Sequence, residues 1–398
     1  MRVDAGNSPA PLGGSTAEPT EPRSYFDTSL AAASLGLVWL GDALIYVVLP
    51  VYPATFGVDA AAVAILLSVN RVIRILGYGW VSPLAQRVGA NVLTAAACAA
   101  GALSTLCYGL TTGFLALMIA RLAWGCAYGI LNLTNTAYAY GDGKNSGKRL
   151  GLNRAVSTLG PVAALASGGW LVTTVGPQQV FIIFGLVGLL AIPLAWQLPR
   201  LERGVGEKKP RADRRWTVSP LNMLFFVVAL GADGVFTATL SSLLADLVPV
   251  ASALIGAGLL LAAQRIAAVV LALASGFIVD RLQPARLIVP CTLVIAAAMA
   301  FIGLDWVYIG AILLIPVRAI FAIVGPVLAA QKSPDRIGAI AAYTTWTDCG
   351  LAAGAFLGII AFESLGSHLT YLTLAAATVL AILWYRLREA SGTSASDV

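Results

Sequence analysis

The feature of this sequence that most limits its possible folds is a series of about twelve continuous apolar stretches, each roughly 19 to 27 residues long. A helix needs about 20 apolar residues to cross the hydrocarbon core of a bilayer. The stretches are rich in Ala, Leu and Gly and lack the alternating pattern of transmembrane strands, so they predict helices and not a β-barrel. Charged residues make up only 11% of the chain, against about 25% in soluble proteins, which excludes a soluble fold.

We therefore predict an all-α membrane protein whose twelve transmembrane helices occupy most of the chain and use the lipid bilayer as solvent. The expected spans are residues 29–52, 60–85, 91–110, 113–138, 150–173, 178–198, 218–241, 253–279, 286–304, 307–330, 337–361 and 369–387.

The loops between these spans differ in charge from one side of the membrane to the other. Lys and Arg gather near the N-terminus, in alternate loops and in a central polar stretch, whereas the other loops, around Asp59, Asp246 and His368, contain none. The positive-inside rule then places both termini in the cytoplasm, with the protein in the cytoplasmic (inner) membrane of a bacterium. This distribution also argues against a nucleic-acid partner. His368 is interpreted as a solvated loop residue, with proton sensing as the alternative.

The two halves of the chain resemble each other. A shift of 194 positions places Arg71 on Arg265 and Arg154 on Asp348. Two parallel six-helix repeats predict pseudo-symmetric bundles around a central cavity. The expected organisation is a disordered cytoplasmic tail at 1–28, an N-terminal bundle at 29–198, a cytoplasmic linker at 199–217, a C-terminal bundle at 218–387 and a cytoplasmic tail at 388–398.

Three motifs carry a resemblance to a known family. The first is the loop from Gly276 to Arg286, which contains Asp280 and Arg281; its first-half counterpart keeps Arg87 but has Gln86 where Asp is usual. The other two motifs are listed by their residues: Arg121, Trp124, Gly125 and Gly129 in the fourth span, and Gly151, Arg154, Gly160, Pro161, Gly168 and Gly169 in the fifth.

With these motifs the chain resembles the major facilitator superfamily over about residues 29 to 387. The resemblance implies a secondary transporter, similar to the drug and metabolite:proton antiporters, with a cytoplasmic gate formed by Asp280, Arg281 and Arg87. It also implies that the first, second, fourth, seventh, eighth, tenth and eleventh spans line the cavity.

Ionisable residues inside predicted spans are costly and therefore mark candidate functional sites. Asp42, Arg121 and Asp233 are the candidates for proton coupling, because a carboxylate in a low dielectric can load and release a proton. For Asp42 the alternative is a permanent ion pair with Arg71 or Arg74. The candidates for substrate binding are Arg71, Arg74, Arg154, Arg265, Arg318, Asp348 and Trp346.

Arginine outnumbers aspartate among these residues, so we expect a small substrate with at least one acidic group, acidic or zwitterionic. The leading hypothesis is a monomeric exporter that exchanges this molecule for protons by alternating access. The alternatives are a proton-coupled uptake symporter for an organic anion or a siderophore-like metal chelate, and a lipid flippase. Five cysteines lie within spans at no metal-ligand spacing, so neither a metal nor a cofactor is expected. No nucleophile or Walker motif is present, and the chain is not expected to be an enzyme.

Overall fold

The computed structural model describes residues 25–140, 146–200, 218–273, 283–333 and 336–394, and within them it is helical with no strand. The helices of the first half are α1 (Tyr25–Val48), the 3-10 turn η1 (Pro53–Phe56), α2 (Ala60–Val88), α3 (Ala90–Leu110), α4 (Phe114–Tyr140), α5 (Ser146–Val175), α6 (Pro177–Leu189) and α7 (Ala191–Trp196). Those of the second half are α8 (Pro220–Ala229), η3 (Leu230–Val235), α9 (Phe236–Ala245), α10 (Val250–Leu273), α12 (Pro284–Gly303), α13 (Val307–Gln331) and α14 (Arg336–Ser394).

The described helices account for the twelve expected spans. Ten of them are long and apolar enough to cross a membrane. One of the ten, within α14, contains two spans that meet at Gly366, whose φ of 78° interrupts the helix. Helix α2, with 29 residues, supplies the remaining span, and it carries the polar residues Asn70, Arg71 and Arg74. The prediction of an all-α membrane fold is therefore confirmed.

Helix α1 begins and ends about one turn earlier than expected. It starts at Tyr25, and it stops at Val48 because Pro50 and Pro53 follow, which cannot donate the backbone hydrogen bonds of a continuing helix. Residues 25–28, which were expected in the N-terminal tail, thus belong to helix α1. The rest of the expected tail, 1–24, and the linker at 201–217 lie outside the described residues.

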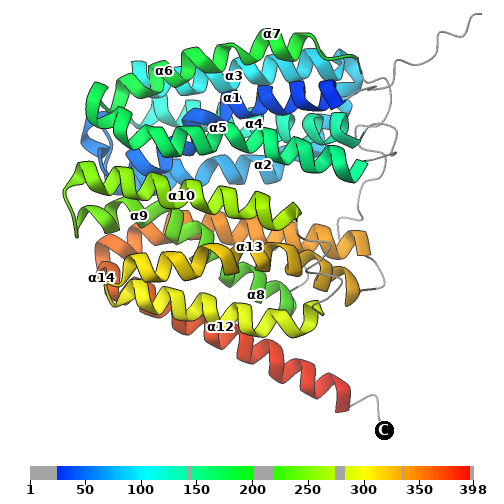
Figure 1. Ribbon diagram of the computed structural model, residues 1–398, viewed down its shortest axis with the longest axis vertical. Helices are drawn as coiled ribbons and strands as arrows, with labels where there is room; N and C mark the ends of the chain where they lie inside the picture. The colour runs from blue at the N-terminus through cyan, green and yellow to red at the C-terminus, as the bar shows by residue number, and fades with distance from the viewer. Residues whose placement is uncertain (1–24, 141–145, 201–217, 274–282, 334–335, 395–398) are drawn as a thin grey trace, which may run out of the picture.

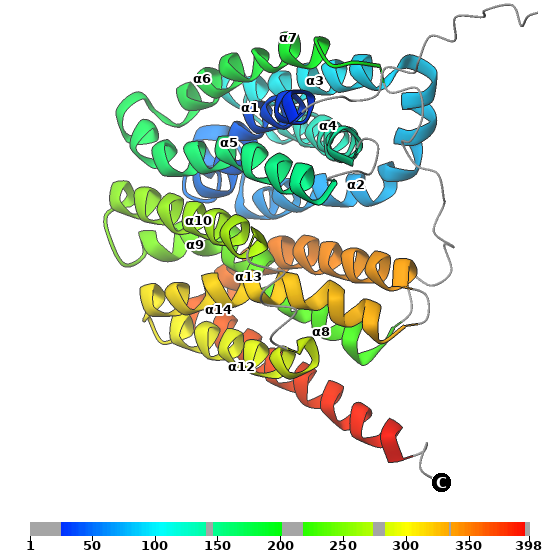
Figure 2. The ribbon, with the colours of Figure 1, turned by 45° about the vertical axis from the view of Figure 1, so that its right-hand side comes forward.

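The helices form two bundles that lie side by side (Figure 1). Helices α1 to α7 pack together in one bundle, and α8 to α14 in the other. The view in Figure 2 keeps the same division, with α5 next to α10 across the boundary. Contacts between the bundles join α5 to α10 and α2 to α14, with smaller contributions from α1 against α9 and α10.

The bundles approach each other closely between the second half of α5 and the first half of α10. A Cβ atom added to Gly258 of α10 would lie 2.2 Å from the Leu165 carbonyl oxygen of α5. One added to Gly169 of α5 would lie 2.7 Å from the Leu254 carbonyl oxygen of α10. Only glycine permits such contact. At the same end, a pocket of about 120 Å³ remains between the bundles, lined by residues that include Pro53, Ala60, Ser242 and Phe362.

Candidate functional site

The most buried ion pair among the described residues joins α1 to α4. Arg121 Nη1 lies 2.5 Å from Asp42 Oδ1, and the two side chains are 0% and 10% exposed. Arg121 also donates from Nε to the Leu66 carbonyl oxygen (2.8 Å) and from Nη2 to the Tyr46 hydroxyl (3.1 Å). Asn70 donates to Asp42 Oδ1 at 3.4 Å. A buried ion pair persists only when its remaining donors and acceptors find partners, and this network provides them.

The alternative to proton coupling at Asp42 was a permanent ion pair with Arg71 or Arg74, but the partner of Asp42 in the structure is Arg121. The Tyr46 ring lies between the Asp42–Arg121 pair and Arg71. The guanidinium carbons of Arg121 and Arg71 both lie 5.3 Å from the centre of the Tyr46 ring. A change in the charge of Asp42 therefore has a short physical route, through Arg121 and Tyr46, to Arg71.

A second ion pair occupies the corresponding place in the other bundle. Arg318 of α13 approaches Asp233 Oδ2 with Nε at 2.6 Å and Nη2 at 2.5 Å, and each side chain is 13% exposed. Asp233 belongs to η3, a π-helical segment between α8 and α9. Such segments often mark functional sites inside helices. Arg318 was expected among the substrate ligands, but the structure shows it bound to Asp233.

Three further arginines lie on aromatic rings near the boundary between the bundles. The guanidinium carbon of Arg74 is 4.7 Å from the Tyr128 ring centre, and that of Arg265 is 5.2 Å from the Trp39 ring centre. Arg71 Nη1 donates to the Leu351 carbonyl oxygen at 3.0 Å, across the boundary. The Trp39 and Tyr128 rings meet edge to face at 5.0 Å. These contacts form a cationic and aromatic region where both bundles contribute side chains.

The remaining candidates surround this region. The Asp348 carboxylate of α14 is acted on by the charges of Arg74 and Arg71. The Arg154 side chain is exposed on α5, and its charge acts on Arg265. Trp346 packs edge to face on Phe226, with ring centres 6.1 Å apart, and its indole Nε1 is buried without an acceptor. A buried donor without a partner is unusual, and it suits a site that receives a polar ligand.

Of the three residues expected to form the cytoplasmic gate, one lies among the described residues. Arg87 is exposed in the last turn of α2, whereas Asp280 and Arg281 lie outside the described residues. Across the described part of the chain, no three His, Cys, Asp or Glu side chains are grouped so as to hold a metal ion.

Sequence reasoning did not identify Trp39 or the Leu351 carbonyl group as partners of the arginines. Trp39 could have been identified from the sequence, because it precedes Asp42 by three residues and therefore lies on the same helix face. The carbonyl oxygen of Leu351 has no signal in the sequence, because every residue carries such a group.

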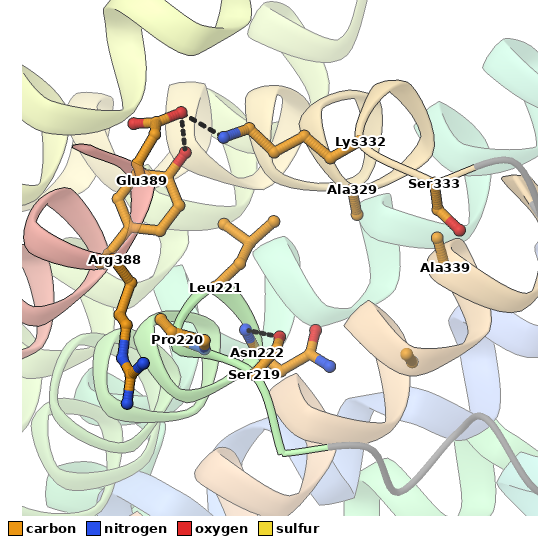
Figure 3. A pocket seen from close by; sticks show the side chains of 12 residues that line it. Ser219, Pro220, Leu221, Asn222, Ala329, Lys332, Ser333, Ala339, Arg388 and Glu389 are labelled. Atoms are coloured by element: carbon orange, nitrogen blue, oxygen red, sulfur yellow. Dashed lines mark hydrogen bonds and ion pairs between the residues drawn. The ribbon is translucent and has the colours of Figure 1, made fainter. Parts of the chain in front are cut away.

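A separate pocket of about 410 Å³ lies at one end of the second bundle, among α8, α13 and α14 (Figure 3). Lys332 forms an ion pair with Glu389 there, and the Tyr385 hydroxyl donates to Glu389 Oε1 at 3.3 Å. Burial lowers the pKa of Lys332, but hydrogen bonds with Glu389 and Tyr385 raise it, and the balance leaves it above its usual value. The amine is therefore charged at neutral pH. This pocket shares no lining residue with the arginine region.

Two helical bundles, each with a buried ion pair, and arginines that make contacts across the boundary define a membrane transporter of the secondary type. The Major Facilitator Superfamily matches residues 31–315, more than half of the chain, and the chain belongs to this superfamily. A search of curated proteins finds no match.

Solved structures with a similar fold include several transporters. The nucleoside transporter NupG is 16% identical with a TM-score of 0.70, covering 91% of this chain and 98% of that one. A bacterial homologue of the human lysosomal transporter Spinster, inward-facing and occupied, is 16% identical with a TM-score of 0.71, covering 93% and 97%. The human organic anion transporter MFSD10 is 15% identical with a TM-score of 0.61, covering 92% and 100%. At these identities the likeness concerns the fold alone.

Proposed function

We propose that this protein exports a small acidic or zwitterionic organic molecule in exchange for protons, by alternating access between the two bundles. The observation that carries the proposal is the buried pair of Asp42 and Arg121, which adjoins the arginine region through Tyr46. A carboxylate in the membrane interior titrates when its environment changes, and so it can exchange a proton between the two faces.

Proton exchange at Asp42 changes the environment of Arg121 and Tyr46. When Asp42 is protonated, Arg121 loses its counter-ion and its positive charge acts more strongly on its surroundings, Arg71 among them. When Asp42 is ionised, the pair is restored and the charge of Arg121 is compensated. In this way the proton and an anionic substrate influence the same cationic region. Asp233, paired with Arg318, is a second proton-coupling carboxylate in the other bundle.

The substrate binds where the arginines are left with neutral partners. Asp42 and Asp233 form their ion pairs with Arg121 and Arg318, and not with Arg71 or Arg265. An acidic group of the substrate supplies the missing charge, and a guanidinium fork matches its oxygens. Asp348 and the Trp346 indole contact polar groups of the substrate. When the substrate is zwitterionic, Asp348 binds its ammonium group. Arg74 and Arg154 extend the cationic surface.

The chain works as a monomer in the bacterial inner membrane, with both termini in the cytoplasm. In this orientation the close contacts of Gly258 and Gly169 lie toward the outer face. Asp280, Arg281 and Arg87 form the gate on the cytoplasmic side.

A second candidate is uptake of an organic anion or of a metal chelate with protons. The arginine region favours uptake as much as export, because a secondary transporter can move its substrate in either direction according to the gradients of substrate and protons. One of the similar folds is that of an organic anion transporter. A lipid flippase is the third candidate, and it requires a lateral opening between the bundles.

Transport by the purified protein in liposomes tests this proposal. Radiolabelled or fluorescent acidic, zwitterionic, neutral and cationic compounds are offered under an imposed proton gradient of either direction. Movement of acidic or zwitterionic compounds against an inward proton gradient supports export, movement with that gradient supports uptake, and movement of lipophilic cations alone contradicts both. Exchange of fluorescent phospholipid between leaflets, measured in the same vesicles, identifies a flippase.

A further inference from the structure

The single histidine of the chain faces an aspartate on a neighbouring turn of the second bundle. His368 lies in α14, two residues after Gly366, where the helix is interrupted. Asp305 lies in the short turn between α12 and α13. His368 Nε2 is 3.6 Å from Asp305 Oδ2, and the two side chains are 63% and 47% exposed. In the proposed orientation both residues lie at the outer face, where an ion dissolved in water has access to them.

The orientation of the His368 ring is fixed by a backbone group. Its Nδ1 lies 2.8 Å from the carbonyl oxygen of Gly303, the last residue of α12. A carbonyl oxygen only accepts hydrogen bonds, so Nδ1 carries the hydrogen and donates it. In the neutral ring, Nε2 then holds the lone pair on the side of Asp305. Histidines that bind metal ions almost always show this arrangement, in which one ring nitrogen donates to a carbonyl or carboxylate oxygen and the other binds the metal.

The Asp305 carboxylate is held by a turn with a strained backbone. Among the described residues other than glycine, Asp305 alone has a positive φ, of 68°. The turn is closed by hydrogen bonds from Asp305 N to the Ile302 carbonyl oxygen (3.1 Å) and from Trp306 N to the Phe301 carbonyl oxygen (2.9 Å). The Trp306 and Phe301 rings stack with their centres 5.7 Å apart. Strained residues of this kind cluster at ligand sites, and they persist because the surrounding structure holds them.

Two electron-rich atoms face each other in this pair. When the imidazole is neutral, Nε2 and the carboxylate are both acceptors, and neither satisfies the other. A proton on Nε2 does not join them well, because 3.6 Å exceeds the length of an N–H···O hydrogen bond, about 2.7–3.2 Å. Zinc forms bonds of about 2.0–2.2 Å to histidine nitrogen and carboxylate oxygen. Two such bonds meet at one ion across 3.6 Å with an angle of roughly 120°, near the tetrahedral geometry of zinc.

We propose that His368 Nε2 and Asp305 Oδ2 bind one zinc ion at the outer face of the second bundle. Within the described ranges no third His, Cys, Asp or Glu side chain joins them, so water completes the coordination. A nitrogen ligand favours zinc over Mg²⁺ and Ca²⁺, which take oxygen ligands. The bound ion joins the α12–α13 turn to the part of α14 that follows Gly366, and so stabilises the outer end of this bundle. The site is independent of the proposed transport function.

Calorimetric titration of the purified protein in detergent tests the site. Zn²⁺, Mg²⁺ or Ca²⁺ is added to the full chain, prepared without a histidine tag and with its five cysteines replaced by alanine so that no thiolate competes for zinc. We expect one Zn²⁺ to bind per chain, Mg²⁺ and Ca²⁺ to give no heat of binding, and the unfolding temperature to rise with zinc concentration. Absence of zinc binding, or binding of Mg²⁺ or Ca²⁺ as strong as that of Zn²⁺, would overturn the proposal.

Conservative substitutions in the same cysteine-free chain test the two ligands. His368→Gln removes the imidazole, and Asp305→Asn removes the charge while keeping a residue type that tolerates a positive φ. Each should weaken zinc binding at least roughly tenfold, because loss of a group that only orients a metal ligand already costs about 10- to 100-fold in affinity. Asp246→Asn alters an exposed carboxylate of another outer loop and is the matched control, expected to bind zinc like the parent chain.

The same variants separate the zinc site from two simpler states of the histidine. Because both side chains are exposed, the variants are expected to unfold at the temperature of the parent chain when zinc is absent. Full zinc binding in Asp305→Asn, with none in His368→Gln, would show that the histidine binds zinc without the aspartate and would overturn the paired site. An unfolding temperature that ignores zinc but rises through His368 as the pH falls from about 7.5 to 5.5 would assign the pair to a proton instead.

Discussion

Asp233 accepts two close contacts from Arg318, from Nε at 2.6 Å and from Nη2 at 2.5 Å, inside a π-helical segment. This Asp233–Arg318 pair in the second bundle is the counterpart of the Asp42–Arg121 pair in the first. The two pairs differ in their surroundings: Arg121 is 0% exposed and has additional acceptors in Leu66 and Tyr46, whereas Arg318 and Asp233 are each 13% exposed. The Asp42–Arg121 ion pair thus lies in a more buried network with additional hydrogen bonds, and the Asp233–Arg318 ion pair is more exposed.

This difference predicts an order of stability effects for three alanine substitutions. Arg121→Ala leaves Asp42 as a buried charge without its cation and is expected to cost about 3–5 kcal/mol. Arg318→Ala is expected to cost less, about 1–3 kcal/mol, because water reaches Asp233. Lys332→Ala breaks a pair whose side chains are 35% and 33% exposed, and about 0–1 kcal/mol is expected. Unfolding in detergent by heat or denaturant measures the order; a cost for Arg318→Ala equal to that of Arg121→Ala would contradict it.

Removing both charges of the buried pair is expected to harm the fold less than removing one. Arg121→Gln alone strands the Asp42 carboxylate, whereas Arg121→Gln combined with Asp42→Asn leaves two neutral, hydrogen-bonding side chains. The double variant should therefore unfold at a higher temperature than Arg121→Gln. Losses that simply add would show that the two residues are not coupled, contrary to the 2.5 Å contact.

The close contact of α10 with α5 predicts opposite outcomes for two neighbouring glycines. Alanine at Gly258 places Cβ 2.2 Å from the Leu165 carbonyl oxygen and forces the bundles apart, whereas alanine at Gly256 finds its nearest atom, Leu244 Cδ1, at 3.5 Å. The first substitution should open the end of the boundary that holds the 120 Å³ pocket, and the second should not.

Cysteine labelling measures this opening. Cysteine is introduced at Ser242, which lines that pocket, in a chain whose five natural cysteines are replaced. With Gly258→Ala, a membrane-impermeant maleimide added outside the cells should label this cysteine several-fold faster than with Gly256→Ala. Equal labelling rates in the two variants would mean that Gly258 does not hold this end closed.

The sequence predicted the helical spans well because long apolar stretches in a membrane have only one structural solution. It could not predict the π-helical η3, since the residues Leu230 to Val235 carry no pattern that separates π from α geometry. Nor could it choose the partner of Asp42. Arg71, Arg74 and Arg121 all lie inside spans, and only the packing of α1 against α4 brings Arg121 to the carboxylate.

Proton movement by reconstituted protein tests the central claim most directly. Wild type and Asp42→Asn are placed in liposomes that contain a pH-sensitive dye, and acidic, neutral and cationic compounds are added under a proton gradient. The account predicts that acidic compounds move protons through the wild type and not through Asp42→Asn. Undiminished proton movement in the variant, or movement driven only by lipophilic cations, would contradict it.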